Sequence, residues 1–291
     1  MGFHHAVIAV RDLAGAIGLF REVVGLDARP GGWHGGRGTE NAVIPFREGY
    51  IELLSIFDAQ KEIAVSGLRG QVLADYLAGR EGGLVGYCLA TDEIFRRAEE
   101  LRGANIVEVP EPLAVSRRTP AGQVLQWHVL LPEGVSWRRP WPFLIQADPA
   151  NPDEHAGTPA PGHPLGATAV AGLSVVVKDL ARSEALYGHF GLAPAGRDRV
   201  PELGADRLRF VHEGFGIDLL APAGAGAVRA ELDEAGEGVF QLSLRVKAMA
   251  RAAAWLARSN VALLPAPGCP GGQLIPPDRA AGARLVLVNA S

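Results

Sequence analysis

The chain has 291 residues, and this length predicts two domains at the usual size of roughly 100–200 residues each. Hydrophobic residues make up 48% and charged residues 21%, which indicates a substantial core and excludes collagen, coiled coils and disordered proteins. The net charge of −4 gives no electrostatic basis for binding nucleic acid. No apolar run approaches the roughly 20 residues of a membrane helix, so we expect no membrane partner.

Glycine, proline and cysteine refine this picture. The 37 glycines and 21 prolines indicate many turns and therefore many short strands. Cys88 and Cys269 are far apart, which argues against a disulfide framework or a cysteine zinc site. Because the N-terminus also lacks a signal-peptide pattern, we expect a cytoplasmic location.

The first predicted unit is a strand followed by a helix. Residues 5–10 are almost entirely apolar, which is typical of a strand covered on both faces. Asp12 is a suitable N-cap, apolar residues then recur at helical spacing, and Gly25 ends the predicted helix. A second unit begins near Leu84, and its helix is expected between Asp92 and Gly103.

The second half of the chain repeats the order of the first. Asp12-Leu13-Ala14 corresponds to Asp179-Leu180-Ala181 at an offset of 167 residues, and residues 50–54 correspond to 216–220 at 166. Two halves with matching units indicate duplication. One helix serves several strands in each unit, which does not fit a Rossmann fold. Four units are predicted, beginning near Phe3, Leu84, Ala171 and Val239.

A segment rich in proline, glycine and alanine separates the halves. Residues 147–168 lack an apolar period and are longer than most loops inside a domain, so they are predicted to be a linker. The expected domains are 1–146, which we consider the functional one, and 169–291. His155 and His163 fall in the linker and are weak site candidates.

Two residues of the first half suggest chemistry. His5 is expected on the concave face of its strand, opposite the bulky Ile8 and Val10. Glu52 lies in an apolar strand, where an unpaired carboxylate would be costly and therefore needs a partner. The pair could be two ligands of a divalent metal or a structural histidine–glutamate hydrogen bond.

Several motifs resemble the vicinal oxygen chelate superfamily, which includes glyoxalase I, extradiol dioxygenases and bleomycin-resistance proteins. The spacing from His5 to Asp12-Leu13, followed by Glu52 in an apolar strand, carries the general resemblance. More narrowly, GGWHGGRGTEN at 31–41 and the segment EGYIELLSI after it resemble the glyoxalase-like group. The segments GQVLQWHVLLP at 122–132 and WPFLI at 141–145 do so too. This closer resemblance covers residues 3–165, and the second half resembles the superfamily more generally.

The resemblance implies an α+β fold. Four tandem βαβββ modules would pair into two curved, barrel-like mixed sheets with helices on the outside. The cavity-facing positions would be His5, Glu52, Gly86 and Gln126 in the first half, and Gly172, Asp218, Gln241 and Val286 in the second. Since the second half keeps fewer ligand-type residues, it is expected to be a degenerate copy.

The resemblance also implies a site. His5, Glu52 and Gln126 would hold a divalent metal (Zn, Fe, Mn or Ni), and His34 would be an acid/base group or a third ligand. The expected substrate-binding residues are Asn41, Trp127 and His128. A turn remains the simpler interpretation of Thr39, and a packed side chain explains Trp127 equally well. Solvated charge is favoured over anion binding for Arg117-Arg118 and Arg138-Arg139.

These features predict a glyoxalase-like metalloenzyme with isomerase, lyase or dioxygenase chemistry on a small oxygen-chelating metabolite. The alternative is a metal-free protein that binds or sequesters a small molecule, and a third interpretation is a structural paralogue without activity. Because Gly86 cannot ligate through a side chain, it favours both rivals. The expected partner is a small-molecule ligand, and modules that pair between chains would give a homodimer.

Overall fold

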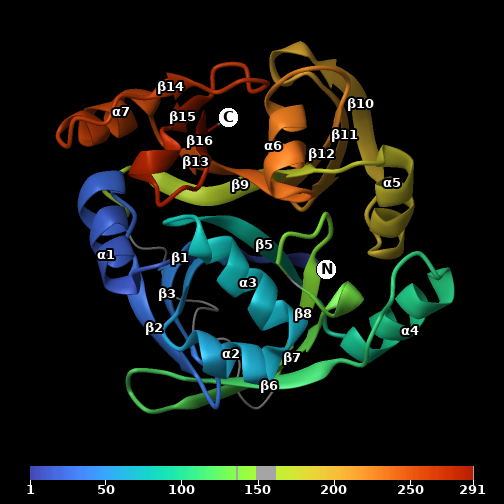
Figure 1. The fold of residues 1–291 in the computed structure, drawn as a ribbon. Helices are drawn as coiled ribbons and strands as arrows, with labels where there is room; N and C mark the ends of the chain where they lie inside the picture. The colour runs from blue at the N-terminus through green and yellow to red at the C-terminus, as the bar shows by residue number, and fades with distance from the viewer. Residues whose placement is uncertain (136, 149–161, 291) are drawn as a thin grey trace.

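A computed structural model describes residues 1–135, 137–148 and 162–290. The chain forms two β-sheets, one from each half, with helices around them (Figure 1). This is the α+β architecture of paired, curved mixed sheets that the resemblance implies. Among the described residues, no helix has both the length and the apolar character that crossing a membrane requires.

The first sheet is a closed barrel with the strand order β1-β4-β3-β2-β6-β7-β8-β5. The barrel closes where Trp33 and His34 of β2 pair with Arg118 and Arg117 of β6. Its strands are β1 (Gly2–Val10), β2 (Arg29–His34), β3 (Thr39–Pro45), β4 (Tyr50–Ile56), β5 (Gly82–Ala90), β6 (Leu113–Arg118), β7 (Val124–Leu130) and β8 (Phe143–Ala147).

The helices of the first half follow the predicted signals in part. Asp12 caps α1 (Leu13–Gly18) by accepting a hydrogen bond from the backbone of Gly15, and the following π-helical turn (Leu19–Val24) ends at Gly25, whose φ is 81°. The second predicted helix is α4 (Ile94–Ala104), and the left-handed residue that ends it is Asn105 rather than Gly103.

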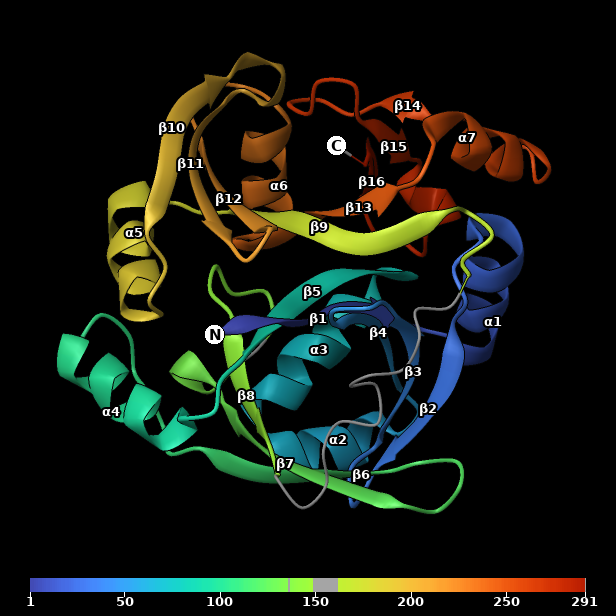
Figure 2. The ribbon, with the colours of Figure 1, turned by 180° about the vertical axis from the view of Figure 1, so that it is seen from behind.

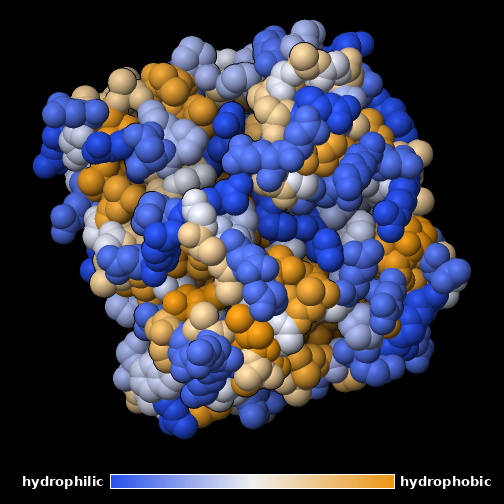
Figure 3. Space-filling view, viewed as in Figure 1, coloured by the Kyte–Doolittle hydropathy of each residue, from blue (hydrophilic) through white to orange (hydrophobic). Residues whose placement is uncertain are grey.

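Two further helices, α2 (Ala59–Ser66) and α3 (Leu68–Ala78), were not expected from the sequence. They lie between β4 and β5 in the chain, and Leu73 and Leu77 of α3 belong to the core inside the barrel. Val65 and Leu68 remain exposed at the junction of the two helices. The face of the molecule on which α2 and α3 lie carries many apolar side chains (Figure 3).

The second sheet has a corresponding order, β10-β11-β12-β9-β13-β16-β15-β14, but it stays open between β10 and β14. His5 lies opposite Tyr50 in the first sheet, and Gly172 lies opposite Gly216 in the second, so the two halves also share their register. The strands are β9 (Ala167–Val176), β10 (Pro194–Val200), β11 (Ala205–His212), β12 (Phe215–Pro222), β13 (Gly238–Val246), β14 (Leu264–Pro265), β15 (Gln273–Ile275) and β16 (Leu285–Asn289). The helices are α5 (Leu180–His189), α6 (Ala227–Ala235) and α7 (Met249–Ala257).

The two sheets pack against each other through β1 and β5 on one side and β9 and β13 on the other (Figure 2). The largest hydrophobic core contains residues of both halves. Phe3 stacks on Phe215 at 4.3 Å between ring centroids, and the hydroxyl groups of Tyr87 and Tyr187 are hydrogen-bonded. The halves therefore share one continuous core.

Charged and polar groups also join the halves. The Arg138 guanidinium lies 3.0 Å from a Glu231 carboxylate oxygen and donates to the Val239 carbonyl at 3.0 Å. Arg138 is therefore an interface residue, which corrects the expectation of solvated charge. His163, at the end of the predicted linker, is buried and accepts a hydrogen bond from the backbone of Asp27. His155 lies outside the described residues.

Candidate functional site

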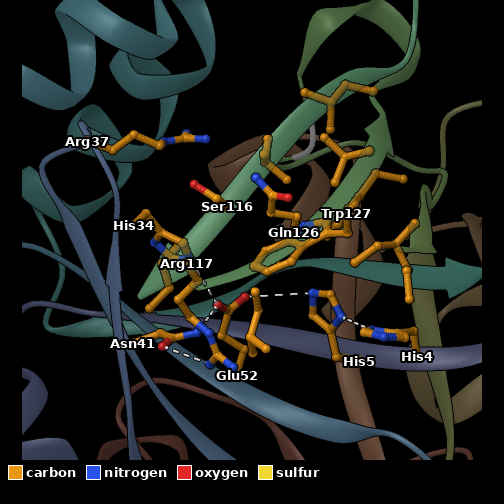
Figure 4. A pocket seen from close by; sticks show the side chains of 18 of the residues that line it. His4, His5, His34, Arg37, Asn41, Glu52, Ser116, Arg117, Gln126 and Trp127 are labelled. Carbon is orange, nitrogen blue, oxygen red and sulfur yellow. Dashed lines mark hydrogen bonds and ion pairs between the residues drawn. The ribbon is translucent and has the colours of Figure 1, made fainter. Parts of the chain in front are cut away.

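A cavity opens in the first barrel, lined by residues of its β-strands and by Arg69 of α3 (Figure 4). Its wall combines ionisable groups with aromatic and aliphatic side chains, as in small-molecule sites. The residues that line it are His4, His5, His34, Arg37, Asn41, Tyr50, Glu52, Leu54, Arg69, Val115, Ser116, Arg117, Leu125, Gln126, Trp127, Val129, Leu131, Trp137, Phe143, Ile145 and Ala147.

The strand β1 brings two histidines to this cavity. Val7 and Ala9 point into the barrel, as the alternation of the strand predicts for the face of His5. An irregularity in the β1–β5 pairing between Phe3 and His5 breaks the alternation, so His4 also lines the cavity. The His5 ring is stacked on that of Tyr50, with 4.8 Å between centroids.

Glu52 of β4 is the centre of the polar cluster. The Asn41 side chain donates a hydrogen bond to Glu52 Oε1 at 2.6 Å, while His5 Nε2 lies 3.7 Å from Oε2. His34 Nε2 lies 4.0 Å from Oε1. Burial raises the pKa of the Glu52 carboxyl group, although the Asn41 hydrogen bond and nearby arginines oppose this shift.

His34 is held in its neutral form. Its Nδ1 is hydrogen-bonded to the Thr39 hydroxyl at 2.9 Å, so Thr39 orients the ring from a strand rather than forming a turn. Burial, together with the positive charges of Arg37 and Arg117, lowers the pKa of His34 to about 3. At neutral pH this imidazole is therefore uncharged, and two of the charges that keep it so, Arg69 and Arg117, come from segments distant in sequence.

The glycines of the GGWHGGRG segment allow the wall to close. A Cβ atom on Gly31 would lie 2.4 Å from Asn41 Oδ1 and 2.8 Å from an Arg117 nitrogen. A Cβ on Gly32, whose φ is +133°, would lie 2.0 Å from the Arg118 carbonyl oxygen across the β2–β6 seam. Only glycine permits these approaches without displacing the neighbours.

Arg117 and Arg118 are neighbours in β6 but lie in different environments. Arg117 is buried and lines the cavity, and its guanidinium donates to Asn41 Oδ1 at 3.4 Å. Arg118 is exposed at the seam. The expectation of solvated charge therefore holds for Arg118 and is wrong for Arg117, because neighbouring residues of a strand point to opposite faces.

The strand β7 carries three of the expected site residues. Trp127 lines the cavity and packs against the core inside the barrel. Gln126 is exposed at the rim, opposite Ser116 of β6. His128 lies further out, with its ring 5.3 Å from that of Phe95, and lines a separate outer groove. The interior positions of β7 are thus Leu125, Trp127 and Val129.

The second half has residues at the positions that correspond to the predicted cavity-facing positions of the first half, and their contacts are those of packing and ion pairing. A Cβ on Gly172 would lie 2.4 Å from the Gly216 carbonyl oxygen. Asp218 forms an ion pair with Arg209 at 2.8 Å, and Val286 is packed in a small apolar core. Gln241 is buried. These residues form no counterpart of the Glu52 cluster.

The resemblance implies a divalent metal, so we asked whether the possible ligand atoms lie close enough together to hold one ion. Ligand atoms bonded at about 2.1 Å to one ion lie at most about 4.2 Å apart. Among the described residues, the only His, Cys, Asp and Glu side chains that bring three ligand atoms within 4.8 Å of one another are His4, His5 and Cys88. His5, Glu52 and His34 do not meet this condition, and Gln126 lies at the rim. These residues therefore do not fit a three-ligand metal centre.

Gly86, a predicted cavity-facing position, lies on β5 opposite Val7, and Cys88 is directly opposite His5, but neither lines the cavity. Several residues that do line it were not predicted from the sequence. Arg69 comes from α3, a helix for which no motif was found. Arg37 lies in the glycine-rich segment quoted for the resemblance, where no role was predicted for it. A single sequence gives no indication that Arg37 and Arg69 will be buried in the same cavity.

The fold and this cavity define the class of the protein. The family model for the glyoxalase-like domain matches residues 3–191, and the chain belongs to this family. The model for the glyoxalase/bleomycin resistance protein/dioxygenase superfamily matches residues 173–275. Both halves are thus of the vicinal oxygen chelate type.

Particular proteins resemble the chain over its whole length. A hypothetical protein from Staphylococcus aureus is 14% identical, with a TM-score of 0.64 and coverage of 99% of both chains. A triple mutant of 4-hydroxymandelate synthase from Streptomyces coelicolor is 13% identical, with a TM-score of 0.66 and coverage of 99% of this chain and 92% of the other. At these identities the likeness establishes the fold alone. No curated protein matches the sequence.

Proposed function

We propose that the protein is an enzyme that transfers a proton on a small, oxygen-bearing metabolite in the cavity of the first barrel. The observation that carries this proposal is the environment of Glu52. Its carboxyl group is buried, accepts a hydrogen bond from Asn41 and lies within 4.0 Å of both His5 and His34. A carboxyl group with a raised pKa is a stronger base when ionised, and such groups are concentrated at active sites.

The chemistry follows from the two oxygens of this carboxylate. Oε1 is held by Asn41, so Oε2 is the oxygen that accepts a proton. In the proposed step, Oε2 removes a proton from a carbon next to a carbonyl group, and the C–H electrons move to the carbonyl oxygen. The positive charge of Arg117 stabilises the resulting enolate. Return of the proton to the opposite face, or to the neighbouring atom, gives an isomer and restores the carboxylate.

Proton exchange with solvent tests this proposal without knowledge of the substrate. The protein is incubated in D₂O with a panel of small 2-oxo acids, 2-hydroxy acids and ketones, and loss of the α-proton signal is followed by NMR. Glu52→Gln should lower the exchange rate at least about 100-fold. Asp218→Asn, at the corresponding position of the second half, is the matched control and should keep the rate. An unchanged rate in Glu52→Gln contradicts the proposal.

The second candidate is a metal-free protein that binds or sequesters a small molecule, since the cavity wall combines ionisable groups with aromatic and aliphatic side chains. Ligand binding without proton exchange on any compound would indicate this candidate. The metal content of protein purified without chelators tests the conclusion that the donor set is incomplete, and stoichiometric metal that is lost in His5→Ala would contradict it.

A further inference from the structure

Three arginines line the cavity, and they differ in how their charge is balanced. Arg37 is paired with Glu62: its Nη2 lies 2.8 Å from Oε1 and its Nε donates to Oε2 at 3.2 Å. Arg37 also donates to the Ser66 hydroxyl at 2.6 Å. Because its carboxylate partner is almost completely buried, Arg37 is a fixed structural element of the wall.

Arg69 is different. Its guanidinium lies over the ring of Trp137, at 5.3 Å from the centroid, and its buried Nε has no hydrogen-bond partner among the described residues. No ion pair joins it to a carboxylate in the described part of the chain. Burial lowers the pKa of Arg69 to about 9, so the group stays charged at neutral pH. A buried charged donor without a partner loses its hydration, and a bound anion would recover that cost.

The charges of the whole cavity favour the same conclusion. Glu52 is the only carboxylate among the described lining residues, whereas three guanidinium groups line the same space. Since Glu62 balances Arg37, Glu52 is the one lining carboxylate that faces Arg69 and Arg117. The single guanidinium of Arg69, which has no ion pair among the described residues, suits a singly charged ligand better than a phosphate of nearly two charges.

The rest of the wall indicates what the anion is attached to. Aromatic and aliphatic side chains cover the side of the cavity formed by β7, β8 and the segment before β8. They include Trp127, Val129, Trp137, Phe143 and Ile145. A ligand that satisfies both parts of the wall carries an anionic group at one end and an apolar body at the other.

We propose that the substrate is a small monocarboxylate with an apolar or aromatic body, and that Arg69 binds its carboxylate beside Glu52. This inference rests on the proposed function, because it names the substrate class of the same cavity. The guanidinium group suits the task, since it offers two parallel N–H donors to a carboxylate. Its position over the Trp137 ring holds it at the cavity wall. Arg69 thus sets specificity, and Glu52 performs the proton transfer.

Titration calorimetry with paired probes tests the inference. The probes are benzoate and phenylacetate, their neutral amides, and phenyl phosphate. Wild type should bind at least one carboxylate at least about tenfold more tightly than the amide and the phosphate, and Arg69→Gln should lose about 10–100-fold. Arg80→Gln is the matched control, because Arg80 also lies over an aromatic ring, that of Tyr76, but outside the cavity.

The outcomes separate this inference from the proposed function. Glu52→Gln should keep carboxylate binding while losing proton exchange. Equal affinity for carboxylate and amide, no binding of either carboxylate, tighter binding of the phosphate, or an unchanged affinity in Arg69→Gln would each overturn the role of Arg69. Carboxylate binding that depends on Arg69, without proton exchange on any compound, would overturn the proposed reaction and leave the binding site standing.

Discussion

Gly31→Ala is the substitution for which the structure gives the clearest expected magnitude. The new Cβ would lie 2.4 Å from Asn41 Oδ1, so Asn41 must retreat by about 1 Å to reach ordinary contact. That movement breaks the 2.6 Å hydrogen bond to Glu52 and crowds the Arg117 guanidinium. Overpacking and the loss of a donor to a buried carboxyl group should together lower the free energy of unfolding by about 2–4 kcal/mol.

Urea unfolding of paired variants measures this effect. Gly35→Ala is the control within the same segment, because its Cβ would meet only the Ser116 hydroxyl at 3.5 Å, an ordinary contact. We expect that control to stay within about 0.5 kcal/mol of wild type. If Gly31→Ala is as stable as Gly35→Ala, the close approach of Asn41 and Arg117 to Gly31 is not a constraint, and the explanation of this segment is refuted.

Three further predictions concern pH, thiols and the interface. Because the native pKa of His34 is about 3, below the ordinary 6.5, only the unfolded chain gains its proton between these values. Stability should therefore fall as pH drops from 6.5 toward 3. His34→Gln should flatten this fall by up to about 1.4 kcal/mol per pH unit in urea unfolding, and an unchanged slope would contradict the assignment. A thiol reagent should modify native Cys269, which is partly exposed, and should leave the fully buried Cys88 unmodified until unfolding. Mass spectrometry that finds both thiols equally labelled would oppose this. Arg138→Ala leaves Glu231 and the Val239 carbonyl without their donor, and it should lower the free energy of unfolding by about 2–4 kcal/mol. Thermal and urea melts measure this change, and an unchanged stability would refute the role of Arg138 at the interface.

The sequence predicted the local parts of the site well. The first strand with His5, the capped helix after Asp12 and the acidic strand residue Glu52 all lie in the expected elements. These features depend on periodicity, capping and the cost of a buried charge, which are properties of short segments. The glycines at 31 and 32 could be quoted as a motif, but their reason appears only when β6 closes the barrel beside them.

The residues that were missed depend on contacts distant in sequence. Arg69 reaches the cavity because α2 and α3 close over the barrel, and the pKa of His34 depends on arginines from three segments. Gln126 was predicted as a metal ligand but is exposed at the rim, whereas the interior face of β7 begins one residue away, at Leu125. A shift of one residue in a strand exchanges its two faces, so such an assignment needs the pairing of the strand.

The strand β1 has a consequence for how the two halves affect each other. One face of this strand presents His5 to the cavity, and the other places Ile8 in the core shared with the second half. The reactive groups are thus separated from the second half by the thickness of a single polypeptide backbone. A substitution on the far side of that wall can alter the position of the imidazole without touching the ligand. The second half, whose corresponding positions form no counterpart of the Glu52 cluster, can therefore still influence how the side chains of this cavity are placed.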